Sequence, residues 1–292
     1  MKKEKNMKKW IMISSLALLA MNAQAQLSKV DNKTLDVIIQ RLESTGKLDE
    51  ALNRVIDKKI KKEKETQARA ALEQEKKNQE NSKAITGFSE QDHYLGDRNA
   101  RYCIIVYEDL ECPYCKVYAD IPESAITKLK DVNFISRPHP LEFHMPAAAK
   151  EAVLAECVAQ ELGNEGYFKF TRAIFKNTLT NGQGLPALSA DYQLKGSMNE
   201  QAIFKELKIA EKSLFAVAKE VGVKNIEETL ACYTDNKTSL KLQNILQFSM
   251  SHGITGTPTT ILKDNKTNKS AMLPGIMKEE ELIEKVNQFM VQ

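Results

Sequence analysis

The most constraining feature of this 292-residue chain is a continuous apolar run that leads into a pair of cysteines. The run is Tyr102-Cys103-Ile104-Ile105-Val106-Tyr107, and ECPYC follows at residues 111–115. A short apolar run without alternation is typical of a strand that is buried on both faces of a sheet. Pro113 suits the first turn of a helix, because that turn does not need the missing N–H. The sequence therefore predicts that Cys112 lies where a buried strand ends and a helix begins.

The segments after this motif predict an α/β unit. We expect a helix over residues 113–130, with Val117 facing inward and a kink at Pro122, and then a strand over residues 132–136. Two strands and an amphipathic helix follow much later, at residues 259–262, 270–273 and 282–290. The expected arrangement is a βαβ half and a ββα half, separated by a helical insert at about residues 146–252.

Two cysteines in this setting predict redox chemistry. The backbone N–H groups of the first helical turn and the positive end of the helix dipole stabilise a thiolate at Cys112, which is therefore the expected nucleophile. Cys115 lies one turn further in, close enough to form a disulfide with Cys112 or to resolve a mixed disulfide with a substrate. Pro113 and Tyr114 are expected to tune the redox potential and to contact the substrate. A CxxC pair can instead bind zinc or copper, although the sequence has no second CxxC to complete a structural zinc site.

A second feature is the segment Gly253-Ile254-Thr255-Gly256-Thr257-Pro258, directly before a predicted strand. A proline at the start of a strand, after a glycine-rich approach, is a natural site for a cis peptide bond. A plain trans X-Pro turn is the alternative, and it is the commoner form of such a bond.

Four patches of sequence are informative together: residues 96–100, the ECPYC motif, HPLEFHMPAAAKEA at residues 139–152 and GITGTPTTIL at residues 253–262. In this order and spacing they resemble the DsbA-like branch of the thioredoxin superfamily. The resemblance implies a domain at residues 88–292 with an α/β thioredoxin fold and an inserted helical domain. It also implies that Cys112 attacks, that Cys115 resolves, and that Thr257-Pro258 is a cis-proline loop that faces them and binds an extended substrate segment.

Within this branch, CPYC with Thr257 before the proline looks more like the isomerase and reductase members DsbC and DsbG than like DsbA, whose motif contains a histidine. The resemblance therefore implies a thiol-disulfide oxidoreductase, and within that class a protein disulfide isomerase or reductase. Its partners would be exported proteins that are unfolded or wrongly disulfide-bonded, and a membrane redox partner. No cofactor is expected beyond the Cys112–Cys115 disulfide, and no metal. The alternatives are a DsbA-like oxidase and, in a different class, a copper-binding or chaperone module.

The first 25 residues have the pattern of a secretory signal peptide. Five lysines precede an apolar stretch from Trp10 to Met21, and Ala23-Gln24-Ala25 supplies a small-residue cleavage site. The apolar stretch is shorter than the roughly 20 residues that span a bilayer. We therefore expect cleavage after Ala25 and a periplasmic location. Cleavage removes five lysines and one glutamate, which changes the net charge from +3 to −1, so no nucleic-acid partner is expected.

The segment that follows predicts a helical stalk. Apolar residues at helical spacing form two stripes within residues 26–60, separated near Thr45-Gly46. They are Leu35, Ile38, Ile39 and Leu42, and then Leu48, Leu52, Val55, Ile56 and Ile60. Residues 61–87 are rich in Lys, Glu, Gln and Ala and predict a solvated helical linker. Because the stripes need cover, we expect a homo-oligomer through residues 26–60, with folding of the stripes onto their own domain as the alternative.

The remaining cysteines carry weaker predictions. Cys157 and Cys232 lie in the helical insert, where relatives carry cysteines at similar places; they would form a second disulfide or pack as two buried thiols. Cys103, inside the apolar run, is expected in the core.

Four polar residues near the predicted site also allow two interpretations each. An acid at Glu108 or Glu111 could take the proton of Cys115, but solvated turn residues are the favoured interpretation. His139 and His144 are expected to pack and to hydrogen-bond to loops rather than to act as ligands or bases.

Overall fold

The computed structural model describes residues 32–188 and 197–291. The predicted signal peptide at residues 1–25 lies outside these ranges and stays a prediction. The chain separates into two compact units between Leu72 and Glu73, and each is described by itself. No helix in the described ranges is both long and apolar enough to cross a membrane.

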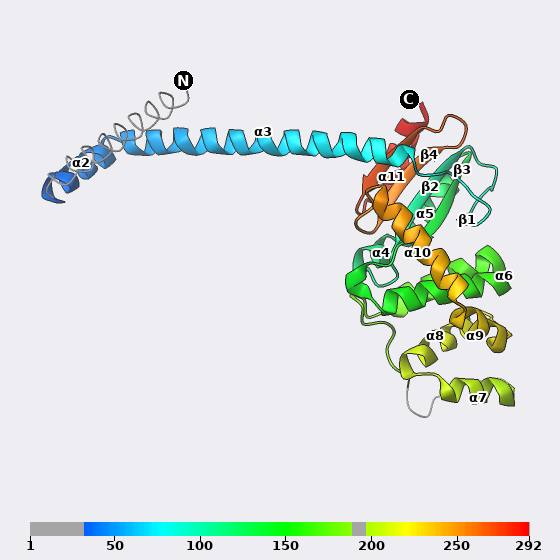
Figure 1. Ribbon diagram of the computed structural model, residues 1–292. Helices are drawn as coiled ribbons and strands as arrows, with labels where there is room; N and C mark the ends of the chain where they lie inside the picture. Colours follow the sequence, from blue (N-terminus) through cyan, green and yellow to red (C-terminus); the bar gives the residue numbers. More distant parts are fainter. Residues whose placement is uncertain (1–31, 189–196, 292) are drawn as a thin grey trace, which may run out of the picture. The chain divides into compact units, whose positions relative to one another are not determined.

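The helices and strands follow one another along the chain as labelled in Figure 1. In order they are α2 (Asn32–Ser44), α3 (Lys47–Lys83), β1 (His93–Leu95), β2 (Tyr102–Glu108), α4 (Pro113–Tyr118), α5 (Asp120–Lys128), β3 (Val132–Pro138), the 3₁₀ helix η1 (Glu142–His144), α6 (Ala147–Asn177), α7 (Met198–Glu206), α8 (Ile209–Glu220), α9 (Ile226–Thr234), α10 (Asn236–Ser251), β4 (Thr259–Asp264), β5 (Ser270–Pro274) and α11 (Glu279–Val291).

A five-stranded mixed sheet forms the centre of the larger unit. Its strand order is β1-β3-β2-β4-β5, with β2 and β3 parallel and the other neighbours antiparallel. Strand β2 is central and buried along its whole length, as its unbroken apolar sequence predicts. Successive side chains of a strand point to opposite faces, so Ile104 and Val106 join the core on one face. Cys103, Ile105 and Tyr107 join the core on the other face.

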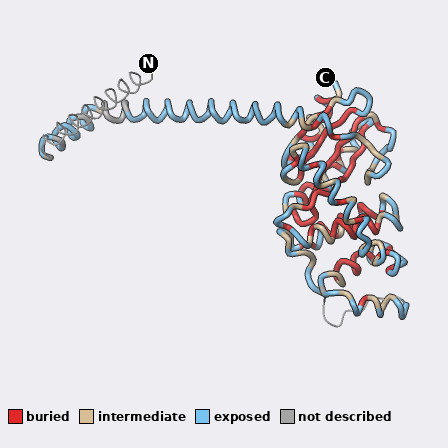
Figure 2. Tube along the Cα trace, viewed as in Figure 1, coloured by how far each residue is buried: buried red, intermediate tan, exposed pale blue. Residues whose placement is uncertain are grey.

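Different parts of the chain cover the two faces of the sheet. Helices α5, α6 and α11 contribute to the core on the Ile104 face. On the other face, Ile85 and Ile254 are completely buried against the strands. Figure 2 shows the buried residues concentrated along the strands and the adjoining helices, whereas α3 is largely exposed. Both faces of the central strands are therefore shielded from solvent.

The helical insert consists of α6 to α10 and lies between β3 and β4 in the sequence (Figure 1). Helix α6 is kinked at Gly163, whose φ of 66° and ψ of −161° are not helical. Cys157 on α6 and Cys232 on α9 form a disulfide with a Cα–Cα distance of 5.7 Å. Closing a loop of 75 residues stabilises the folded state by about 4 kcal/mol in the chain-entropy model. The expected βαβ and ββα halves with a helical insert are confirmed.

Three local expectations were wrong. The helix after the motif breaks at Ala119, between α4 and α5, and not at Pro122. The reason is that the proline lacks the N–H that would bond to the carbonyl of Tyr118, one turn earlier. Val117, expected to face inward, is 66% exposed. Strand β1 was not expected, because its three residues carry too short a pattern to predict a strand.

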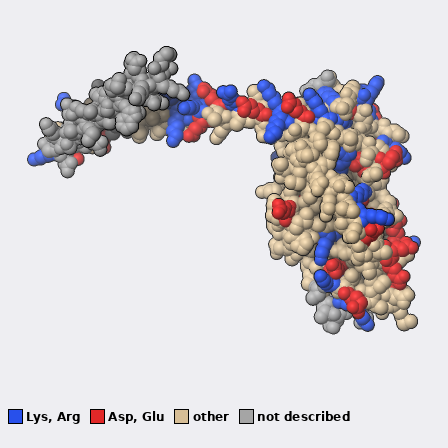
Figure 3. Space-filling model, in the orientation of Figure 1, with Lys and Arg blue, Asp and Glu red and all other residues tan. Residues whose placement is uncertain are grey.

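Helices α2 and α3 are separated by a turn at Gly46, which has a φ of 64°. The second apolar stripe and the polar linker are one continuous helix of 37 residues, because no Pro or Gly interrupts residues 47–83. Acidic and basic side chains alternate along α3, as Figure 3 shows. The apolar side chains of the stripes that the structure describes are exposed: Ile38, Ile39, Leu52, Val55, Ile56 and Ile60.

Candidate active site

The pair of cysteines sits at the junction between β2 and α4. Cys112 is the residue before the first helical turn and has extended backbone angles, and Pro113 occupies the start of the helix. The N–H of Lys116 donates to the carbonyl of Cys112 at 3.0 Å, which closes the first turn. Cys112 and Cys115 are buried free thiols, whereas Tyr114 between them is 63% exposed. The motif therefore presents Tyr114 to solvent and keeps both sulfur atoms largely covered.

The loop before β4 faces this junction. Strand β4 runs antiparallel to β2 and pairs Thr259 with Tyr107, so the start of β4 lies beside the end of β2. The Thr257-Pro258 bond at this point is cis. The Sγ of Cys112 donates to the carbonyl oxygen of Thr257 at 3.3 Å. The structure thus brings together two segments that the sequence analysis singled out separately.

The surroundings of Cys112 favour its thiolate. The pKa of Cys112 is lowered from 9.0 to about 6, chiefly by the hydrogen bond from the Cys115 thiol. Burial acts in the opposite direction, and hydrogen bonds from the backbone N–H groups of Cys115 and Tyr114 add to the lowering. These N–H groups belong to the first helical turn, where they have no helical acceptor. The thiolate form of Cys112 is consequently favoured at neutral pH.

Cys115 has the opposite character. Burial is the main cause that raises its pKa well above the ordinary value, and the neighbouring Cys112 and Glu108 raise it further. Glu108 is itself buried, which raises its pKa, and it accepts a hydrogen bond from Ser136 Oγ. A second hydrogen bond joins Ser136 Oγ to Tyr167 Oη at 3.1 Å. Cys115 therefore stays protonated, next to a buried carboxyl group.

Two more buried carboxyl groups hold the segment before Cys112 in place. Asp109 accepts from the N–H of Glu111 at 2.8 Å and from that of Leu141 at 2.7 Å, and its Oδ2 lies 2.8 Å from His144 Nδ1. Glu111 accepts a hydrogen bond from the Thr178 hydroxyl. It also accepts from the N–H of Gly184 at 2.9 Å. The interpretation of Glu108 and Glu111 as solvated turn residues is wrong, because both side chains are buried.

Glu151 on α6 is a buried acid that the sequence analysis missed. Its side chain is 1% exposed, and within the described ranges its two oxygens have no conventional hydrogen-bond partner. Burial, followed by the charge of Glu111, raises its pKa to about 9. Its position was visible in the sequence, since it lies three residues after Ala148 and four before Ala155 on the buried face of the helix. Glu151 is therefore neutral at pH 7 and faces Glu111.

The two histidines of this region are structural. His139 Nδ1 lies 2.7 Å from Ser249 Oγ, and burial lowers the pKa of His139 to about 4. His144 contacts Asp109 as described. Both therefore serve packing and loop hydrogen bonds, as expected.

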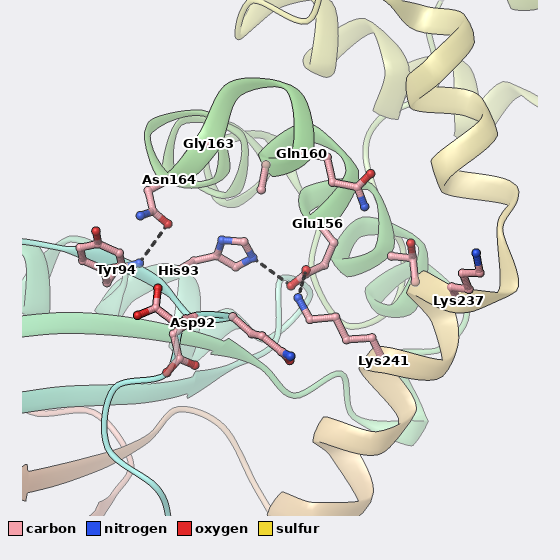
Figure 4. A pocket seen from close by; sticks show the side chains of 13 residues that line it. Asp92, His93, Tyr94, Glu156, Gln160, Gly163, Asn164, Lys237 and Lys241 are labelled. Atoms are coloured by element: carbon pink, nitrogen blue, oxygen red, sulfur yellow. Dashed lines mark hydrogen bonds and ion pairs between the residues drawn. The ribbon is translucent and has the colours of Figure 1, made fainter. Parts of the chain in front are cut away.

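A separate hollow of about 490 Å³ lies beside β1, between α6 and α10 (Figure 4). Its central groups pair with one another: Glu156 Oε1 lies 3.0 Å from His93 Nε2, and Glu156 Oε2 lies 2.6 Å from Lys241 Nζ. Burial raises the pKa of Glu156, but these two partners outweigh it and hold that pKa below its ordinary value. Asn164 Oδ1 accepts from the N–H of Tyr94 at 3.3 Å. These bonds join β1 to the insert, and we assign no ligand to the hollow.

Comparison with known proteins agrees with this geometry. Residues 88–278 match the family model described as Thioredoxin. The chain belongs to this family. DsbA2 of Pseudomonas aeruginosa is 31% identical, with a TM-score of 0.51 over 70% of this chain and 96% of that one. No curated protein matches the chain.

Two further solved structures share the fold of this thioredoxin-family chain. The thiol-disulfide exchange protein alpha-DsbA2 of Wolbachia pipientis is 21% identical, with a TM-score of 0.50 over 69% of this chain and 88% of that one. The alpha-DsbA1 protein of the same organism is 20% identical, with a TM-score of 0.50 over 72% of this chain and 98% of that one. The expected thioredoxin fold and DsbA-like branch are confirmed, and the thioredoxin-family chain is a thiol-disulfide oxidoreductase of this type.

The first prediction concerns the thiolate of Cys112. In the reduced protein, the rate of alkylation of Cys112 by iodoacetamide should rise with a midpoint near pH 6, not 9. Cys115→Ala removes the main hydrogen-bond donor to the thiolate and should move this midpoint upward by about one unit or more. Cys103→Ala, which removes the third free thiol, is the matched control and should leave it in place. A wild-type midpoint above about 8 would contradict the assignment of Cys112 as the activated thiol.

The second prediction concerns Glu151. Between about pH 4.5 and 9, Glu151 is protonated in the folded protein and ionised in the unfolded protein. The free energy of unfolding therefore falls as the pH rises, by up to about 1.4 kcal/mol per pH unit. Glu151→Gln removes this dependence, and urea unfolding should show a gain over wild type that is larger at pH 8 than at pH 5. Glu142→Gln, on an exposed residue, is the control without such a gain. An equal effect at both pH values would show that Glu151 is not buried as a neutral acid.

Proposed function

We propose that this protein is a periplasmic protein disulfide isomerase that also acts as a reductase. The observation that carries the proposal is the thiolate-favouring Cys112 beside the cis Thr257-Pro258 loop. A nucleophilic sulfur next to the loop before a strand suits attack on a disulfide that an extended polypeptide presents.

The reaction begins when the Cys112 thiolate attacks one sulfur of a substrate disulfide. A new bond forms between Cys112 and the substrate, and the old bond breaks, leaving the second substrate sulfur as a thiolate. In isomerisation, a different substrate thiolate then attacks the substrate sulfur of the mixed disulfide, so that a new substrate disulfide forms and Cys112 leaves again as a thiolate. In reduction, Cys115 attacks Cys112, which leaves the Cys112–Cys115 disulfide and a reduced substrate.

Cys115 must lose its proton before it attacks, although burial favours its neutral form. Glu108 is the acid that we assign as the proton acceptor, because it is buried and close enough to raise the pKa of Cys115. Its own raised pKa makes it a stronger proton acceptor than an ordinary carboxylate. Its hydrogen bond from Ser136 holds it in position.

The substrate side of the site involves Pro113, Tyr114, Thr257 and Pro258. Tyr114 is exposed beside Cys112 and offers an aromatic surface to an incoming chain. Thr257 Oγ1 is buried and, within the described ranges, has no hydrogen-bond partner of its own. The carbonyl oxygen of Thr257 accepts from Cys112 Sγ at 3.3 Å.

The preference for isomerisation over net oxidation rests on the apolar side chains of α2 and α3. Val37 is 59% exposed and Val55 is 65% exposed, and such side chains in a row on a helix favour association with copies of the same helix. We propose a homo-oligomer through residues 26–60. Several sites on one assembly can act on one misfolded substrate, and shield each other from a membrane oxidase. The substrates would be exported proteins with wrong disulfides, and a membrane partner would keep the pair reduced.

The proposal is tested with scrambled ribonuclease. Wild-type protein in a glutathione buffer should restore ribonuclease activity, and Cys112→Ser should reduce this rate at least about 100-fold, because the serine hydroxyl is not ionised at neutral pH. Cys103→Ala is the control with the wild-type rate. If the wild type oxidises reduced ribonuclease but does not correct the scrambled form, the protein is a DsbA-like oxidase. If Cys112→Ser keeps redox activity but loses bound copper, the site belongs to a metal-binding module.

The contribution of the stalk is tested in the full chain. Ile38→Glu combined with Ile56→Glu places charges in the exposed apolar rows and should lower the sedimentation mass to that of a monomer. The isomerase rate should fall several-fold, while insulin reduction by Cys112 continues. Gln40→Glu combined with Asn53→Glu adds the same charge at exposed polar positions of the same helices and should keep the wild-type mass. A wild type that already sediments as a monomer would remove the oligomer from the proposal.

A further inference from the structure

The last turns of α3 lie along the edge of the sheet, near the cis-proline loop. From Glu73 onward, the helix belongs to the same compact unit as the sheet. Gln79 Nε2 donates to the carbonyl of Ser270 on the edge strand β5 at 2.6 Å. Gly253 allows a close approach, because a Cβ at this position would lie 2.2 Å from Asn81 Nδ2. These contacts fix the end of α3 beside β5 and the loop.

A groove of about 280 Å³ runs between this part of α3 and the cis-proline loop. Gln74 and Asn78 line it from the helix, Thr257 and Pro258 from the loop, and Met272 from β5. Cys112 Sγ contacts the carbonyl of Thr257, and Thr257 also lines the groove. The groove therefore begins beside the reactive sulfur and extends from there along α3 and β5. A polypeptide that reaches Cys112 across the loop would therefore run on past the helix.

The edge of β5 gives the groove a backbone surface. Ser270 turns its carbonyl outward to Gln79 on α3. In an antiparallel strand, every second residue directs its backbone groups to the same side. Met272 therefore directs its N–H and carbonyl to the outer edge as well, where it lines the groove. An extended chain could pair with this edge in the manner of an added strand.

The two side chains from α3 match such a chain in chemistry. Gln74 Nε2 donates to Asn78 Oδ1 at 2.8 Å, and this bond leaves Gln74 Oε1 as an acceptor and Asn78 Nδ2 as a donor. A residue of an extended chain presents its N–H and its carbonyl to the same side. The remaining acceptor and donor of the bonded pair complement one such N–H and carbonyl.

We propose that Gln74 and Asn78 are positioning residues that hold an extended segment of the substrate polypeptide in this groove. They bond to peptide groups and not to particular side chains, so they strengthen binding of extended, unfolded chains with little preference for sequence. The inference rests on the proposed function, because it needs a polypeptide as the disulfide substrate. It extends that function by giving the end of the stalk helix a direct part in substrate binding.

The experiment compares two double variants of the full chain. Gln74→Ala with Asn78→Ala removes both carboxamides and places a good helix former at each position. The control is Lys76→Ala with Glu80→Ala, which also introduces two alanines but on the opposite side of the same helical turns. The substrate is a dimer of an unstructured peptide of about ten residues joined by one disulfide, with reduced glutathione as the electron donor. The rate of reaction of Cys112 with Ellman's reagent, which has no peptide chain, is measured alongside.

The Gln74/Asn78 variant should raise KM for the peptide dimer about fivefold, equivalent to about 1 kcal/mol, with kcat changed less than about twofold. The Lys76/Glu80 variant should keep the wild-type KM. An unchanged KM in the first variant overturns the proposal. So does an equal loss with Ellman's reagent, because the residues would then act on Cys112 itself. If the wild type reacts with Ellman's reagent but does not reduce the peptide dimer, the proposed function fails and this inference fails with it.

Discussion

The active site depends on the antiparallel pairing of β2 with β4. This pairing sets the end of β2 beside the start of β4, and so joins Cys112 to Thr257 across 145 residues of sequence. The burial of β2 on both faces holds the pairing in place, because a slip in register would exchange the side chains of two closely packed cores. The helical insert between the two strands can be long because the sheet alone determines where its ends meet.

Burial also explains why the two cysteines differ. Cys112 lies at the N-terminal end of α4, where backbone N–H groups and the Cys115 thiol donate hydrogen bonds to its sulfur. Cys115 is instead buried and lies near Glu108. The acids around the motif are costly to bury, and each is compensated: Asp109 and Glu111 by hydrogen bonds from loops, and Glu151 by staying neutral. The same hydrogen bonds hold the segment before Cys112 in one conformation, which keeps the nucleophile facing the cis-proline loop.

Helix α3 takes part in two kinds of surface. Its first half carries exposed apolar side chains on a polar helix, which is the pattern of a helix that associates with another. Its last turns pack on β5, and the fully buried Ile85 follows shortly after the helix ends. Because the end of the helix is part of the folded unit, its last turns lie beside the groove that we propose for the substrate.

The sequence by itself determined the features that depend on local pattern. The unbroken run before the CPYC motif predicted a buried strand, and Pro113 predicted a helix start. The glycine-rich segment before Pro258 made a cis peptide bond one of two possibilities, and the family resemblance implied it. The sequence pattern did not predict the features that depend on contacts with distant parts of the chain. Glu108 and Glu111 look like turn residues until the insert folds over them, and the short strand β1 exists only because it pairs with β3. Gln74 and Asn78 are ordinary residues of a polar helix, and only the packing of that helix on β5 places them in the groove. Local pattern decides which segment forms a helix or strand, but burial and proximity arise from contacts across the whole chain.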